Sequence, residues 1–245
     1  MKFALEFVAS LCTALFAGAP LYINLVEHPA RMECGTALAA AEFGPSYRRA
    51  TMMQASLAVV AFLTGTWAWW LNSTGAWLVG GILIGAVVPF TLIAILPTNK
   101  KLLDPLLDPN SELARTLLKK WGRLHAVRTV LSVVALVVFL AEMAAADVGH
   151  QREAELREDL FILRQVVSLY TLDKQRAPQT PNDLVEAGYL RSIPVDPFTG
   201  RADWVSEAEP EPEIQDPLLA GPGPGIVVHS ASNLTGQDGT AYRSW

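Results

Sequence analysis

Charged side chains are scarce in this chain of 245 residues, where Asp, Glu, Lys and Arg make up 18% against 51% hydrophobic residues. Soluble domains usually carry about a quarter charged residues, so this shortage argues against a purely soluble protein. Cysteine is scarce too: Cys12 lies in an apolar run and Cys34 in a polar stretch, a pattern that excludes a disulfide framework. No basic stripe accompanies the net charge of −5, which argues against nucleic-acid binding.

The charges that are present divide the chain into two regions. Residues 1–145 carry 11 Lys and Arg against 8 Asp and Glu, whereas residues 146–245 carry 8 against 16. Two regions with different solvents therefore share one chain. We expect a membrane domain over residues 1–146, whose partner is the lipid bilayer, and an aqueous domain over residues 147–245.

Four apolar runs predict membrane-spanning helices. Each run is close to the roughly 20 residues that a helix needs to cross the hydrocarbon of a bilayer; the runs cover residues 3–26, 52–70, 76–96 and 126–146. The first run exceeds the 7 to 15 residue core of a cleavable signal peptide, so we interpret it as a retained span. An amphipathic stretch that opens at Ser111 leads into the fourth run. The fold class is therefore mainly α, with a four-helix transmembrane bundle followed by a small α+β domain.

The distribution of Lys and Arg predicts the orientation of the bundle. The connections at residues 27–50 and 98–128 carry three and seven of these residues, whereas the opposite side has only Lys2 and the uncharged turn at 72–75. Positively charged connections stay in the cytoplasm. We therefore expect a multi-pass protein of the bacterial inner membrane with both termini on the periplasmic side.

Polar side chains gather at the cytoplasmic ends of all four predicted spans, and they are Glu27, His28, Gln54, Thr98, Asn99, His125 and Arg128. One interpretation is that they are interfacial anchors whose polar groups reach the lipid headgroups. The other is a polar pocket in the bundle, in which His125, Glu27 and His28 transfer protons and Arg128 holds an anion. The spacing of these residues lacks the motifs of a metal site, so we expect no metal in the bundle.

The motifs around this layer resemble a known family. They are FAGAPLYINLVEHPAR at 16–31, PSYRR at 45–49, MQA at 53–55, LPTN at 96–99 and WGRLHAVR at 121–128. They are similar to the four-helix membrane family that includes the fungal anthrone oxygenases. The resemblance implies a cofactor-independent oxygenase fold for polycyclic phenols, in which the substrate carbanion itself reacts with dioxygen.

For that chemistry the protein must abstract a proton, stabilise a phenolate and exclude water. We assign His125 as the base and Arg128 as the anion stabiliser, with Glu27 and His28 completing the candidate catalytic set. The candidate substrate-binding residues are Tyr22, Asn24, Gln54, Asn99 and Trp121, of which Trp121 would stack on an aromatic ring.

The region after the fourth span predicts a small α+β domain. Apolar residues recur at spacings of three and four from Leu156 to Tyr170, which predicts that the fourth helix continues to Lys174. A short helix from Pro181 to a cap at Gly188 follows, and residues 201–206 and 225–230 are expected strands. Residues 207–225 hold five acids and five prolines, which favours an exposed excursion without a buried core.

This second region resembles the globular domain of the major pseudopilin of type II secretion systems, through LREDLFILRQVVSLYTLDKQRAPQT, DLVEAGYLRSIPVDPFTG and the closing VVHSAS and DGTAYRSW. The resemblance implies a long helix packed on a short antiparallel sheet and a calcium-binding loop near the C-terminus. Asp238 and Asn233 would be the calcium ligands, and the alternative is a hydrogen-bonded turn. The cleaved leader and the early glutamate of pseudopilins are missing before the fourth span, so we do not expect polymerisation.

Two functions remain open. The first is a membrane enzyme of the anthrone-oxygenase type, with its site at the cytoplasmic end of the bundle. The second is a non-enzymatic, secretion-related envelope protein whose bundle anchors the pseudopilin-like module for a protein partner. Transport is a weaker third option, because neither an inverted repeat nor a pair of broken helices is visible.

Overall fold

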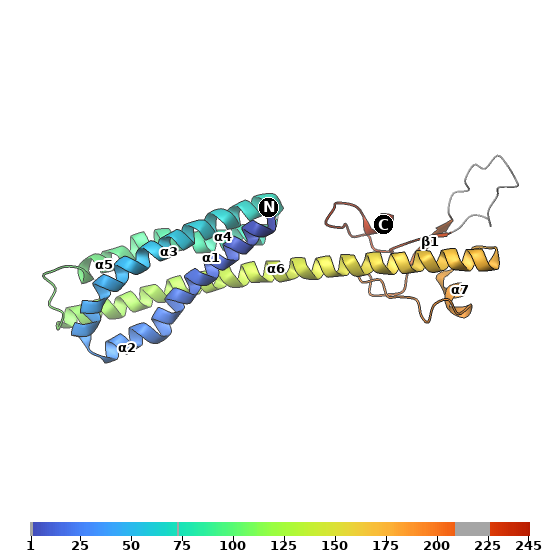
Figure 1. The fold of residues 1–245 in the computed structure, drawn as a ribbon. Coiled ribbons are helices and arrows are strands. Elements are labelled where there is room, and N and C mark those ends of the chain that lie inside the picture. The colour runs from blue at the N-terminus through green and yellow to red at the C-terminus, as the bar shows by residue number, and fades with distance from the viewer. Residues whose placement is uncertain (1, 73, 209–225) are drawn as a thin grey trace. The chain divides into compact units, whose positions relative to one another are not determined.

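The computed structural model describes residues 2–72, 74–208 and 226–245 (Figure 1). Most of the exposed excursion expected at 207–225 therefore lies outside the described residues. The chain divides into two compact units, Met1–Ala145 and Ala146–Trp245, and helix α6 contributes residues to both. The fold is mainly helical, with a small two-stranded sheet in the second unit.

In the described residues, four helical segments are long and apolar enough to cross a membrane. Two of these segments consist of two α-helices joined by a π-helical turn, and the other two are single α-helices. In chain order the elements are α1 (Lys2–Tyr22), η1 (Ile23–Glu27), α2 (His28–Glu33), α3 (Thr36–Asn72), α4 (Gly75–Phe90), η2 (Thr91–Ile95), α5 (Leu96–Leu102) and α6 (Glu112–Lys174). By length and composition, the chain is a multi-pass membrane protein.

Proline explains the two π-helical turns. A proline lacks the backbone N–H, and its ring clashes with the carbonyl group four residues earlier. Leu25 of η1 lies four residues before Pro29, and Ile93 of η2 lies four residues before Pro97. The wider π turn relieves this clash without ending the helix. Both turns therefore lie just before a proline, at His28-Pro29 and Leu96-Pro97, whereas Pro20, Pro45 and Pro89 lie inside regular α-helices.

The bundle core consists of three apolar clusters along its length. The cluster at the end that holds α2 and α5 includes Phe43 and Trp121, the middle one includes Phe16 and Ile84, and the last one includes Phe139. Close packing of helices in a membrane depends on shape, because lipid offers no hydrophobic gain between helices. The aromatic side chains therefore set the spacing of the helices at each level.

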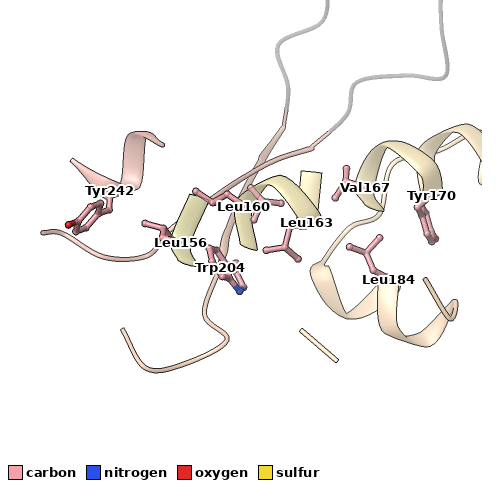
Figure 2. Packing of buried hydrophobic residues seen from close by; sticks show 9 residues of the cluster. Leu156, Leu160, Leu163, Val167, Tyr170, Leu184, Trp204 and Tyr242 are labelled. Atoms are coloured by element: carbon pink, nitrogen blue, oxygen red, sulfur yellow. The ribbon is translucent and has the colours of Figure 1, made fainter. Parts of the chain in front are cut away.

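The second unit packs the last part of α6 against a short helix and a two-stranded sheet. Helix α7 (Pro181–Glu186) opens with a capping box between Thr180 and Asp183, and Gly188 follows with φ +79°. Strands β1 (Val205–Ala208) and β2 (Ile226–His229) pair antiparallel, with Val205 opposite His229. Figure 2 shows Leu156, Leu160, Leu163 and Val167 of α6 in a core with Leu184, Trp204 and Tyr242.

The first strand begins at Val205, four residues later than expected. Residues 196–200 form a turn, in which the buried Asp196 carboxylate accepts hydrogen bonds from the backbone N–H groups of Phe198 and Thr199 at 2.7 and 3.3 Å. The backbone carbonyl of Arg201 accepts a hydrogen bond from the N–H of Asp196 at 2.9 Å, so Arg201 still belongs to this turn and not to the strand. Ser230 donates to the same carboxylate at 2.5 Å. Asp196 thus ties this turn to the end of β2.

Candidate functional site

A cavity of about 150 Å³ lies inside the first unit, between the π-helical turns and α6. Side chains from all four membrane-crossing segments line it. The lining residues are Phe16, Ile23, Arg31, Phe43, Ser46, Tyr47, Ala50, Thr51, Gln54, Ala55, Ala58, Val87, Val88, Thr91, Leu92, Ile95, Leu96, Asn99, Trp121, His125 and Arg128. The set is mostly apolar, with polar groups converging from different helices, as is usual for small-molecule sites.

An aromatic cluster surrounds His125. Trp121 precedes it by one helical turn on α6, and their ring centroids lie 4.5 Å apart. Trp121 also contacts His28 and Phe43 edge to face, at 5.3 and 5.4 Å between centroids. His125 is 2% exposed, and its Nδ1 has no hydrogen-bond partner among the described residues. This nitrogen is therefore available to a bound molecule.

Arg128 lies one turn further along the same helix. Its Nη2 donates a hydrogen bond to Oε1 of the buried Gln54 at 2.7 Å, and its guanidinium carbon lies 5.4 Å from the centre of the Phe16 ring. Within the part of the chain that the structure describes, no carboxylate lies within ion-pair distance of Arg128. Its positive charge is therefore not neutralised by a neighbouring acid.

Arg31 also lines the cavity, and the sequence analysis treated it only as a positive charge of the connecting segment. The side chain is 3% exposed and forms ion pairs with Glu27, one helical turn earlier, and with Glu42 at 3.6 Å. The spacing of Glu27 and Arg31 by four residues at the end of a span is the sequence signal that could have identified this pair. Tyr47 and Thr91 are further lining residues that the sequence analysis did not select.

The structure brings together five of the candidate residues in the cavity wall: Gln54, Asn99, Trp121, His125 and Arg128. The other four candidates of the bundle lie outside the wall. Tyr22 is 57% exposed, and Asn24 donates a hydrogen bond to Oγ1 of Thr129 at 2.7 Å. Glu27 forms an ion pair with Arg31, and the ring of His28 contacts Trp121 edge to face.

In the second unit, Asp238 closes a turn. Its Oδ1 accepts hydrogen bonds from the hydroxyl and the backbone N–H of Thr240, at 2.6 and 2.9 Å, and these bonds lower the pKa of the carboxyl. Asn233 is exposed. No group of three or more His, Cys, Asp or Glu residues that could hold a metal occurs in residues 2–72, 74–208 and 226–245. Calcium binding by Asp238 and Asn233 therefore stays a prediction.

The comparisons with known proteins concern the first unit. No curated protein and no solved structure matches the chain significantly. A family model described as anthrone oxygenase matches residues 43–138, a segment that begins within α3 and ends within α6. The segment that is similar to the anthrone oxygenase family therefore contains Gln54, Asn99, Trp121, His125 and Arg128, the five candidate residues that line the cavity.

Proposed function

We propose that the bundle is a membrane-embedded, cofactor-independent enzyme of the anthrone-oxygenase type, which acts on an aromatic substrate. The observation that carries this proposal is the position of His125 and Arg128, which belong to the segment similar to that family and line one cavity of the bundle. His125 offers an unpaired ring nitrogen, and Arg128 offers a cation without a carboxylate partner among the described residues. Trp121 supplies an aromatic wall beside both.

The proposed reaction starts at a methylene group activated by an aromatic ring. His125 removes a proton from that carbon, and Arg128 stabilises the negative charge that the ring system spreads to its oxygen. The resulting carbanion forms a C–O bond to dioxygen, which gives a peroxide anion. This anion takes up the proton held by His125, and the hydroperoxide then loses its O–O bond and the remaining C–H proton. Loss of water then converts the methylene group and dioxygen into a carbonyl group and one water molecule. The apolar wall excludes water from the carbanion.

Oxygen uptake by the full chain in lipid nanodiscs tests this proposal. The probes are anthrone and 4-hydroxyphenylpyruvate, each of which has a methylene group conjugated with a ketone oxygen that can take up the charge of the carbanion. We expect His125→Asn to lower the rate at least about 100-fold, since general base catalysis contributes 10²–10⁴. His150→Asn is the matched control, because His150 is exposed on the same helix. No uptake by the unaltered protein, or equal rates in the two variants, contradicts the proposal.

We further propose that the protein resides in the bacterial inner membrane with both termini in the periplasm. The Lys and Arg residues of the connections at 27–50 and 98–128 support this orientation. The exposed Trp67 and Trp70 near the uncharged turn support a membrane interface at that level, because indole rings favour such interfaces.

The alternative is a non-enzymatic envelope protein whose second unit is a pseudopilin-like module that binds a protein partner. A specific feature favours it: the second unit has a hydrophobic core of its own, built from a long helix and an antiparallel strand pair. This alternative predicts that deletion of residues 150–245 abolishes the cellular phenotype of the protein, whereas His125→Asn leaves it intact. The enzyme proposal predicts that His125→Asn abolishes it.

A further inference from the structure

The size of the cavity limits what it can hold. A cavity of about 150 Å³ in a protein core accommodates a single benzene ring, and small-molecule sites for larger ligands usually measure about 300–1,000 Å³. The cavity of the bundle measures about 150 Å³. One aromatic ring with short substituents therefore matches this volume better than a fused three-ring system does.

The charge of the wall is one-sided. Two arginines, Arg31 and Arg128, line the cavity, and the lining contains no aspartate or glutamate. Arg31 is only 4% exposed. Its acidic partners Glu27 and Glu42 lie outside the lining. Arg31 is already paired with these two glutamates, so Arg128 is the arginine of the wall without a carboxylate partner among the described residues. A cation in a mostly apolar cavity attracts an anionic group more strongly than the same cation in water.

The unpaired polar atoms of the wall indicate which groups the ligand carries. Nε of Arg31 and Nε of Arg128 are buried donors without a hydrogen-bond partner in the described part of the chain. Oδ1 of Asn99, in a residue 1% exposed, is a buried acceptor that lacks a partner there as well. Buried polar groups of this kind are costly unless something pairs with them. Nδ1 of His125 is the fourth unpaired atom of the wall, and it belongs to the proposed base. The other three, two donors and one acceptor, match a ligand with an anionic oxygen group and one hydroxyl donor.

We infer that the cavity binds a single aromatic ring that carries an anionic oxygen group, held by Arg31 and Arg128, and a hydroxyl group that donates to Asn99. The ring lies between apolar walls that include Phe16, Val87 and Trp121. The inference rests on the proposed function for the site and names its substrate class as small hydroxyaromatic acids.

Binding of matched probes to the full chain in nanodiscs tests this inference by titration calorimetry. The probes are 4-hydroxyphenylacetate, its neutral amide and the tricyclic anthrone, each corrected for uptake by empty nanodiscs. We expect the acid to bind at least about tenfold more tightly than the amide, because a hydrogen bond to a charged group contributes more than a neutral one. Equal affinities for the acid and the amide, or tighter binding of anthrone than of the acid, overturn the inference.

Variants identify the source of the preference. Arg128→Gln removes the cation from the wall, and we expect it to abolish the preference for the acid over the amide. Arg49→Gln removes a cation from the exposed face of α3 and keeps the preference. Arg31 forms an ion pair with Glu27, so its removal also leaves that glutamate unpaired. Arg31→Gln is therefore compared with Arg31→Lys, which retains the charge and should retain most of the preference for the acid. An unchanged preference in Arg128→Gln overturns the inference.

The two proposals fail in different ways. Selective binding of the acid without oxygen uptake for any probe contradicts the enzyme proposal and leaves the ligand class standing. Oxygen uptake with anthrone, without a preference for the acid, contradicts the ligand class and leaves the enzyme proposal standing.

Discussion

Phe139 is completely buried in the bundle because small residues leave room for its ring. It stacks on Trp77 with 4.9 Å between ring centroids. A Cβ atom on Gly80 would lie 2.3 Å from Cε1 of the Phe139 ring, and one on Gly65 would lie 2.9 Å from its Cζ. Glycine at these positions therefore allows α3, α4 and α6 to approach each other around one aromatic side chain.

We expect Gly80→Ala to destabilise the bundle by about 1–3 kcal/mol, the usual cost of an extra methyl group in a packed core. The phenylalanine ring cannot move away easily, since it is enclosed on the other side by Trp77. Thermal unfolding of the full chain in detergent measures the effect. Gly18→Ala is the control, because no heavy atom lies within 4 Å of its added Cβ. Recovery of stability in Gly80→Ala combined with Phe139→Leu is expected, and its absence would refute the steric explanation.

Tyr242 gives the second unit a pH-dependent contribution to stability. Burial, and next the hydrogen bond that its hydroxyl donates to Glu153 at 3.0 Å, raise the pKa of Tyr242 to about 12. An unfolded tyrosine has a pKa of about 10. The folded state therefore disfavours the phenolate, so the contribution is fully present below pH 10 and is lost as the pH rises from about 10 to about 12.

We expect Tyr242→Phe to lower the melting temperature of the second unit at pH 8, because Glu153 then loses a donor, at a cost of about 1–3 kcal/mol. We also expect the difference from the unaltered protein to shrink between pH 10 and pH 11. Scanning calorimetry of the two proteins at pH 8, pH 10 and pH 11 measures this difference in melting temperature. A difference that stays constant with pH would mean that Tyr242 does not titrate with the proposed shift.

At the residue level, the sequence predicted best where helical spacing decides the geometry. Trp121, His125 and Arg128 are spaced by four and three, and all three line the cavity because one face of α6 presents them. The role of Arg31 could not be predicted in this way, since its burial depends on how α2 packs against the other helices. Tyr22 and Asn24 are the sequence neighbours of the lining residue Ile23, but they do not line the cavity. Tyr22 is exposed, and Asn24 donates a hydrogen bond to Thr129.

At the level of elements, the two π-helical turns position part of the cavity wall. Ile23 of η1 and Thr91, Leu92 and Ile95 of η2 are lining residues. A π turn inserts extra backbone into a helix and changes the direction in which the following side chains point. The removal of the proline that causes the turn should therefore alter the cavity.

We expect Pro97→Ala to lower the affinity for 4-hydroxyphenylacetate about tenfold or more, because an α-helical turn at 91–95 rotates three lining side chains away. Stability should remain equal or increase, since alanine favours a helix interior over proline. Pro45→Ala is the control, because Pro45 is exposed in α3 and does not line the cavity. An unchanged affinity in Pro97→Ala would show that the π turn does not shape the site.

Periodicity in the sequence predicted the helices but not these turns. The apolar pattern from Ser111 to Lys174 predicted one continuous helix, and α6 extends from Glu112 to Lys174. A π turn leaves the pattern of apolar residues nearly unchanged over five residues, so only the prolines indicate it. The late start of β1 was missed for a different reason, because the backbone carbonyl of Arg201 accepts a hydrogen bond from the preceding turn at Asp196 and does not pair with β2.

At the level of the whole molecule, the uneven charge of the chain determines the expected orientation in the membrane. Lys100, Lys101 and the basic residues of the first part of α6 follow the third span, whereas the turn between α3 and α4 carries no charge. The cavity lies among the residues next to these basic connections, at Gln54, Asn99 and His125. If the orientation is as proposed, the cavity lies near the cytoplasmic ends of the spans.

Reporter fusions test this orientation. Alkaline phosphatase, which is active only outside the cytoplasm, should be active when it is fused after Trp245, and green fluorescent protein at the same place should stay dark. Insertion of the fluorescent protein between α5 and α6, near Asp108, should give a fluorescent cell, because that connection is expected in the cytoplasm. Since positive charge sets the orientation, two lysines added to the uncharged turn, for example Asn72→Lys with Thr74→Lys, should reduce the phosphatase activity after Trp245. Fluorescence from the fusion after Trp245 in the unaltered chain would reverse the orientation, and the cavity would then open toward the periplasmic face.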